Sequence, residues 1–187
     1  MLSENITPQK LRLLAGLLAK PGEDSLAALE EIAKENHWLY ESVQQLKDIS
    51  LEHWQGEHTQ LFINGHPETT CPPFESVYRH SVMNGPVCNK IEQIYQSIGL
   101  EPVDDMLPDY LGVMLECAAY LLEQKLPTEH PQEDVGDLVH IEETGKYFQT
   151  LWQDHLAKWV PKFANDLQKH SELRLYQQLG LKLKELF

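Results

Sequence analysis

Cys71-Pro72-Pro73-Phe74-Glu75-Ser76-Val77-Tyr78 interrupts a chain that is patterned as helix on both sides. Proline lacks a backbone N–H, and its ring clashes with the preceding helical turn, so two adjacent prolines exclude a helix interior or a central strand. Two aromatic side chains and a carboxylate follow these prolines within five residues. We therefore expect a stiff, partly apolar loop with a surface suited to binding a peptide.

Apolar residues on either side of this loop recur at spacings of three and four, which is the period of a helix. Clear examples are Leu11, Leu14 and Leu18 before the loop, and Leu111 and Met114 after it. No sustained alternation with the period of a strand occurs, and no internal repeat is present. The sequence predicts an all-α fold, a single-domain bundle of about eight to ten helices.

Glycines and prolines mark the expected helix ends. We expect Asn64-Gly65 to end one helix in a left-handed turn, Gly99 to end another, and Pro108 to begin the next. A further helix is expected over about 139–157, with Pro161 bending or restarting it. The proline loop and the residues before Pro108 then lie between helices.

The length of 187 residues fits one domain that spans residues 1–187. An acidic hinge loop near residues 100–108 divides this domain into a possible N-lobe over 1–100 and a possible C-lobe over 109–187. The net charge of the chain is −14. Residues 101–143 carry −11 of it, because they contain twelve acidic side chains and one basic side chain, Lys125.

This charge distribution argues against a nucleic-acid partner, because neutralising phosphates requires a basic surface. A basic peptide is the natural electrostatic complement of the acidic segment. The alternative is that these acids only keep a long connection solvated.

The three cysteines form no CxxC motif and leave an odd one out, which favours a reduced, cytoplasmic setting. The N-terminal residues lack the basic and apolar regions of a signal peptide. No apolar run approaches the roughly 18 residues that a bilayer requires. We expect a cytoplasmic protein without membrane insertion.

Catalytic and metal-binding motifs are missing from the sequence. It contains no glycine-rich phosphate loop, no GxSxG motif and no HExxH motif. Asp137 and His140 can meet on a helix, but two ligands do not make a metal site. We expect neither an enzyme nor a resident metal or cofactor.

Four motifs occur in order: Glu57-His58-Thr59-Gln60-Leu61-Phe62-Ile63-Asn64-Gly65, Pro72-Pro73-Phe74-Glu75-Ser76-Val77-Tyr78, Pro108-Asp109-Tyr110-Leu111-Gly112 and His155-Leu156-Ala157-Lys158-Trp159-Val160-Pro161-Lys162-Phe163. Together they resemble the TorD/DmsD/NarJ-type family of redox-enzyme maturation chaperones. His58 and Gln60 replace a tyrosine and an arginine of the family pattern, Phe74 replaces a frequent tryptophan, and Tyr110 replaces the hinge histidine.

The resemblance implies a cytoplasmic chaperone of anaerobic respiration. Such a protein binds the twin-arginine (Tat) signal peptide or the apoprotein of a molybdopterin oxidoreductase, and holds this client until its molybdenum cofactor is inserted, before export. It has no cofactor of its own, and neither guanine nucleotide nor molybdopterin binding is predicted. The resemblance leaves a monomer and a domain-swapped dimer equally open.

Binding such a peptide requires carboxylates for two guanidinium groups and an apolar wall for the stretch beside them. The candidate carboxylates are Glu75, Asp104, Asp105 and Asp109. The whole set of candidate peptide-binding residues is Leu61, Phe62, Pro72, Pro73, Phe74, Glu75, Ser76, Tyr78, Gly85, Asp104, Asp105, Pro108, Asp109, Tyr110 and Gly112.

Structural readings of the same residues stay open. Phe62 and Tyr78 also fit a core, Glu75 also fits a helix cap, and Gly85 and Gly112 also fit packing positions. Two other functions remain as alternatives: a nucleotide- or pterin-handling enzyme with a pocket at the acidic hinge, and a constitutive scaffold subunit of an oxidoreductase complex.

Overall fold

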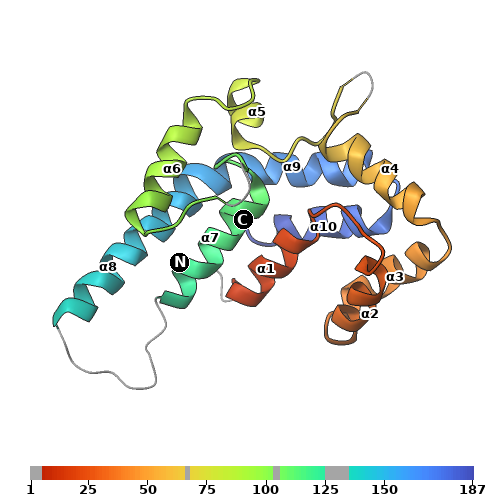
Figure 1. The fold of residues 1–187 in the computed structure, drawn as a ribbon, viewed down its shortest axis with the longest axis horizontal. Coiled ribbons are helices and arrows are strands. Elements are labelled where there is room, and N and C mark those ends of the chain that lie inside the picture. The colour runs from red at the N-terminus through yellow and green to blue at the C-terminus, as the bar shows by residue number, and fades with distance from the viewer. Residues whose placement is uncertain (1–5, 66–67, 103–105, 125–134) are drawn as a thin grey trace. The chain divides into compact units, whose positions relative to one another are not determined.

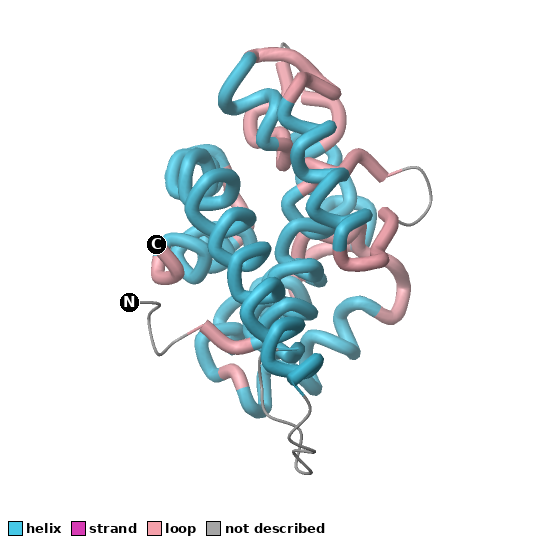
Figure 2. Tube along the Cα trace, turned by 90° about the vertical axis from the view of Figure 1, so that its left-hand side faces the viewer, coloured by secondary structure: helices cyan, strands magenta, loops and turns pink. Residues whose placement is uncertain are grey.

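The computed structural model describes residues 6–65, 68–102, 106–124 and 135–187, with side chains of the last range described from Glu142 onward. This described part is all-α, as predicted, and Figure 2 shows helices joined by loops without a strand. Its one isolated bridge joins Phe74 and Tyr110 in antiparallel fashion.

The chain divides into two compact units. Unit 1 comprises Met1–Gly16 and Phe74–Val160, and unit 2 comprises Leu17–Pro73 and Pro161–Phe187. The units do not follow the predicted lobes 1–100 and 109–187, because each combines an early segment with a late one.

The helices of unit 1 are α1 (Pro8–Gly16), α5 (Glu75–His80), α6 (Val87–Ser97), α7 (Leu111–Gln124), α8 (Val135–Gln149) and the π-helical segment η2 (Thr150–Leu156). Those of unit 2 are α2 (Ser25–Glu35), the short 3-10 helix η1 (His37–Leu39), α3 (Tyr40–Lys47), α4 (Leu51–Phe62) and α10 (Arg174–Lys184). The boundary between the units falls within α9 (Ala157–His170), at Pro161.

Helix α1 packs along α7 in the core of unit 1 (Figure 1). Leu11 and Leu14 of α1 and Leu115 of α7 have no exposed surface. At the edge of this contact, the Arg12 guanidinium pairs with the carboxylates of Glu116 (3.3 Å) and Glu123. These pairs are partly exposed, so burial of the leucines contributes most of the stability of this contact.

Aromatic side chains form the core of unit 2. The Trp54 Nε1–H donates a hydrogen bond to the Tyr176 hydroxyl (3.0 Å), and the Phe62 ring lies edge-on to the Tyr176 ring at 5.2 Å. His58 contacts the carbonyl oxygen of Leu18 (3.0 Å), and burial lowers the pKa of its imidazole. Phe62 is therefore a core residue here, 5% exposed.

Some predicted helix ends are confirmed. Gly99 has φ +72°, and the N–H groups of Gly99 and Leu100 bond to the carbonyls of Gln96 and Tyr95 at the end of α6. This is the Schellman arrangement that favours glycine.

Other expected helix ends are wrong. Gly65 is not left-handed; a Cβ there would lie 2.4 Å from the Glu68 carbonyl oxygen, so close packing excludes a side chain. Helix α7 begins at Leu111 and not at Pro108, because Asp109 and Tyr110 pair with Glu75 and Phe74 at the start of α5. Pro161 does not restart the helix, because α9 continues through it. A bend at Pro161 stays a prediction.

The three cysteines are free and buried, and burial raises the pKa of Cys71, Cys88 and Cys117 to about 12. Because the thiolate is the reactive form, we expect none of them to react with a thiol reagent in the folded protein at pH 8. Ellman titration should count no thiol in buffer and three in guanidinium chloride. Rapid reaction of any thiol in the native protein would contradict this burial.

None of the described helices combines the length and apolar composition needed to cross a membrane.

Candidate functional site

Asp109 fixes the start of α5 from a distant part of the chain. Its carboxylate accepts the Ser76 N–H (2.7 Å), and its carbonyl accepts the Glu75 N–H (3.2 Å). It thereby satisfies two amides of the first turn, as an N-cap does. The Asp109 side chain is fully buried. The motif after the prolines and the motif before α7 are therefore joined in unit 1.

Glu75 is the centre of a buried ionic cluster. Its carboxylate accepts a hydrogen bond from Arg79 Nη1 (2.5 Å), and both its oxygens lie 3.1 Å from His155 Nδ1. Arg79 also donates to the Asp154 carbonyl (3.1 Å). Glu75 has no exposed surface and His155 is 4% exposed. The fourth motif, which begins at His155, thus joins the same site.

Two aromatic pairs flank this cluster. The rings of Phe74 and Tyr110 lie 5.6 Å apart, and those of Tyr78 and Trp159 lie 5.4 Å apart. Trp159 is buried, whereas the other three rings are half-buried. Burial raises the pKa of the Tyr110 hydroxyl to about 12. Phe74 and Tyr110 therefore form a partly exposed aromatic surface of neutral side chains.

The two candidate glycines leave room for their neighbours. A Cβ at Gly112 would lie 2.6 Å from Cε1 of the Tyr110 ring. A Cβ at Gly85 would lie 3.2 Å from Val82 Cγ2 and 3.3 Å from Ser76 Cβ. Gly112 thus allows the Tyr110 ring to lie against the first turn of α7.

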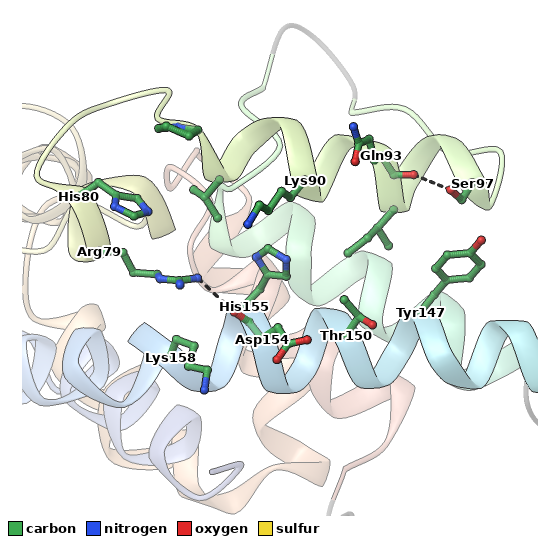
Figure 3. A pocket seen from close by; sticks show the side chains of 13 residues that line it. Arg79, His80, Lys90, Gln93, Ser97, Tyr147, Thr150, Asp154, His155 and Lys158 are labelled. Carbon is green, nitrogen blue, oxygen red and sulfur yellow. Dashed lines mark hydrogen bonds between the residues drawn. The ribbon is translucent and has the colours of Figure 1, made fainter.

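A cavity of about 720 Å³ opens beside the buried cluster. Figure 3 shows its lining side chains on α5 and α6 along one wall, and on α8, η2 and α9 along the other. One end carries Arg79, His80, Lys90, His155 and Lys158, together with Asp154. The other end carries Gln93, Ser97, Tyr147 and Thr150. We call this cavity the basic trough.

The π-helical segment Thr150–Leu156 contributes three residues to the trough, Thr150, Asp154 and His155. A π-helical turn holds one more residue than an α-helical turn, and such segments are rare and frequent at functional sites. The segment also stacks Trp152 on Phe148, with ring centroids 5.4 Å apart. The site therefore includes a departure from regular helix.

The fifteen predicted residues fall into three groups. Nine are described in unit 1: Phe74, Glu75, Ser76, Tyr78, Gly85, Pro108, Asp109, Tyr110 and Gly112. Four belong to unit 2: Leu61, Phe62, Pro72 and Pro73. Asp104 and Asp105 lie outside the described residues. Peptide binding by this set stays a prediction.

The two described candidate carboxylates do not face solvent. Glu75 and Asp109 are buried and bonded within unit 1, so neither presents a free carboxylate to a ligand in this structure. Glu75 does not cap α5, because Asp109 does. Their observed role is to hold α5 against the segment before α7.

Four residues of the site were not among the predicted ones: Arg79, His155, Lys158 and Trp159. The fourth motif contains His155, Lys158 and Trp159, but the sequence assigned no role to them. Arg79 lies four residues after Glu75, the spacing of an ion pair on one helix face. No group of three or more histidine, cysteine or acidic side chains suited to a metal occurs among the described residues.

A family model described as nitrate reductase delta subunit matches residues 17–165. The chain belongs to the nitrate reductase delta subunit family. This confirms the resemblance to the NarJ/TorD-type redox-enzyme maturation proteins. The nitrate reductase delta subunit family is a maturation chaperone family and is not known to be catalytic.

The chain is also similar in fold to a crystal structure from Archaeoglobus fulgidus that is described as a candidate redox enzyme maturation protein. The TM-score is 0.66 at 24% sequence identity, and the match covers 97% of this chain and 94% of that one. No curated protein sequence matches the chain.

Proposed function

We propose that this member of the nitrate reductase delta subunit family is a cytoplasmic chaperone for a molybdopterin oxidoreductase. It binds the twin-arginine signal peptide, the apoprotein or both, and it holds this client until the cofactor is inserted, before export. It acts without catalytic turnover and without a cofactor of its own.

The observation that carries the proposal is the half-exposed aromatic pair Phe74–Tyr110. The two residues are 36 positions apart and are joined by a backbone bridge, and their rings lie 5.6 Å apart. Each belongs to one of the motifs of the family resemblance. A ready-made aromatic surface suits the apolar stretch of a signal peptide, since aromatic anchors supply much of the affinity of such sites.

The negative net charge of the protein favours binding of the arginine-containing half of such a peptide. The net charge of −14 attracts two arginines at long range, raises the association rate and makes binding sensitive to salt. Glu75 and Asp109 contribute indirectly, because they hold Phe74 and Tyr110 in register. The direct partners of the arginines are then exposed acids, with Asp104 and Asp105 as the remaining candidates.

Phe74→Ala is expected to weaken binding of a twin-arginine signal peptide about tenfold or more. The reason is the lost burial of an aromatic side chain, about 1.5–3 kcal/mol for a full side chain, where 1.4 kcal/mol is a factor of ten. Isothermal titration calorimetry with a synthetic signal peptide measures the change.

Tyr40→Ala is the matched control, because Tyr40 is an exposed aromatic residue of unit 2, 62% exposed. Its affinity for the peptide should equal that of the unchanged protein. An unchanged affinity of Phe74→Ala, or an equal loss in both variants, would contradict the aromatic site.

A further inference from the structure

The basic trough places positive charge in a protein of strongly negative net charge. Lys90 on α6 and Lys158 on α9 line it from opposite walls (Figure 3). Their ammonium groups form no hydrogen bond or ion pair with any residue that the structure describes. Among the residues that the structure describes, Asp154 is the one acidic member of the lining. Two unpaired cations in the lining of one cavity favour an anionic occupant.

The length of the trough favours an extended chain. Its lining along α8, η2 and α9 runs over twelve residues from Tyr147 to Lys158, and their eleven steps span at most roughly 16 Å at the α-helical rise of about 1.5 Å per residue. This length accommodates about five residues of extended peptide at roughly 3.3 Å each. The amide of Gln93 and the hydroxyls of Tyr147 and Thr150 at the far end can bond to a peptide main chain.

The arrangement suits separate carboxylates better than a compact phosphate. The cations stand on three different helices, α5, α6 and α9. Arg79 already donates to Glu75 and to the Asp154 carbonyl, so its guanidinium is not free to fork around one phosphate. The sequence contains no glycine-rich loop to supply backbone amides.

We propose that the basic trough binds an acidic, extended segment of the client protein. The carboxylates of this segment lie between Lys90 and Lys158, and its main chain lies toward Tyr147 and Thr150. The inference rests on the proposed function, because that function makes the occupant a protein. A twin-arginine sequence is excluded from this trough by like charge, so the basic and acidic segments of a client occupy different places on the chaperone.

The test uses a fluorescein-labelled peptide of four glutamates and two glycines, followed by fluorescence anisotropy. Lys90→Glu combined with Lys158→Glu is expected to weaken its binding at least tenfold. The matched control is Lys20→Glu combined with Lys169→Glu, which changes the net charge equally at two exposed lysines outside the trough. The control should bind within a factor of about four of the unchanged protein, since only its long-range field differs.

Three results would overturn the trough proposal. One is an equal loss in the control, which assigns binding to the overall field. Another is displacement of the peptide by inorganic pyrophosphate at a concentration well below that of competing unlabelled peptide, which assigns the trough to a small anion. The third is full binding by Lys90→Gln combined with Lys158→Gln, a variant that removes both charges without reversing them and serves where charge reversal prevents folding.

A second titration separates this proposal from the proposed function. Protein that binds the acidic peptide but no twin-arginine peptide contradicts signal-peptide binding and supports the trough. Protein that binds the twin-arginine peptide but not the acidic peptide contradicts the trough alone. The trough variant is expected to keep its affinity for the twin-arginine peptide.

Discussion

Glu75→Ala is expected to destabilise the protein by about 3 kcal/mol, the lower end of the cost of removing one partner from a buried ion pair. The substitution leaves His155, buried in unit 1, without its carboxylate. Arg79 also loses its partner, but about one third of its side chain is exposed, so water compensates part of that loss. Urea unfolding followed by circular dichroism measures the change in the free energy of unfolding.

Glu116→Ala is the matched control for Glu75→Ala. Glu116 also pairs with an arginine, Arg12, but its side chain is 52% exposed. Its removal should cost about 1 kcal/mol or less, as for other exposed pairs. Glu75→Gln, which keeps the volume and one acceptor, should fall between the two. Equal stabilities of the Glu75→Ala and Glu116→Ala variants would show that the Glu75 cluster contributes no more than a surface pair.

Gly180→Ala is expected to destabilise unit 2 by about 2 kcal/mol, a typical cost of overpacking. A Cβ on Gly180 would lie 2.6 Å from the carbonyl oxygen of Ala164 and 3.2 Å from Leu167 Cβ. The first neighbour is backbone, so α10 must move away from α9. This cost exceeds the roughly 0.5–1 kcal/mol that alanine gains over glycine within a helix.

Gly56→Ala provides the control with the opposite sign. Gly56 lies in α4, and nothing lies within 4 Å of a Cβ at this position. This variant should gain about 0.5–1 kcal/mol from helix propensity alone. Thermal or urea unfolding measures the stability of both variants. A stabilising effect of Gly180→Ala would mean that α9 and α10 are not in close contact.

Local sequence patterns were sufficient to predict most of the helices. The spacing of Leu11 and Leu14 in α1, and of Leu111 and Met114 in α7, identified the buried faces, since the helical period places such residues on one side. Gly99 was identified as a helix end because a left-handed residue favours glycine. These features depend on residues close together in sequence.

The site depends on pairs that no local pattern connects. Ser76 and Asp109 are 33 residues apart, and Glu75 and His155 are 80 apart. The sequence places carboxylates next to aromatic residues, which suggested that Glu75 and Asp109 bind a peptide. In the structure both are buried and bond to residues of the protein itself. A buried carboxylate must be paired, so its role was decided by tertiary contacts.

The basic trough could not be predicted from composition either, because its residues are also far apart in sequence. Arg79, Lys90 and Lys158 are spread over 80 residues of an acidic chain, so no window of sequence shows a basic patch. The π-helical segment was equally invisible, because Leu151, Trp152, His155 and Leu156 read as an ordinary buried helix face. The basic charge of the trough and the π-helical segment depend on contacts between distant segments of the chain.

The division of each unit between early and late segments has a consequence for biosynthesis. Within unit 2, helices α2, α3 and α4 leave the ribosome first, but its aromatic core also needs Tyr176 in α10. At about 5–20 residues per second, translation from Pro73 to α10 takes on the order of ten seconds. During this interval the apolar faces of Trp54 and Phe62 lack that covering helix. The core of unit 2 is therefore incomplete until α10 has been synthesised.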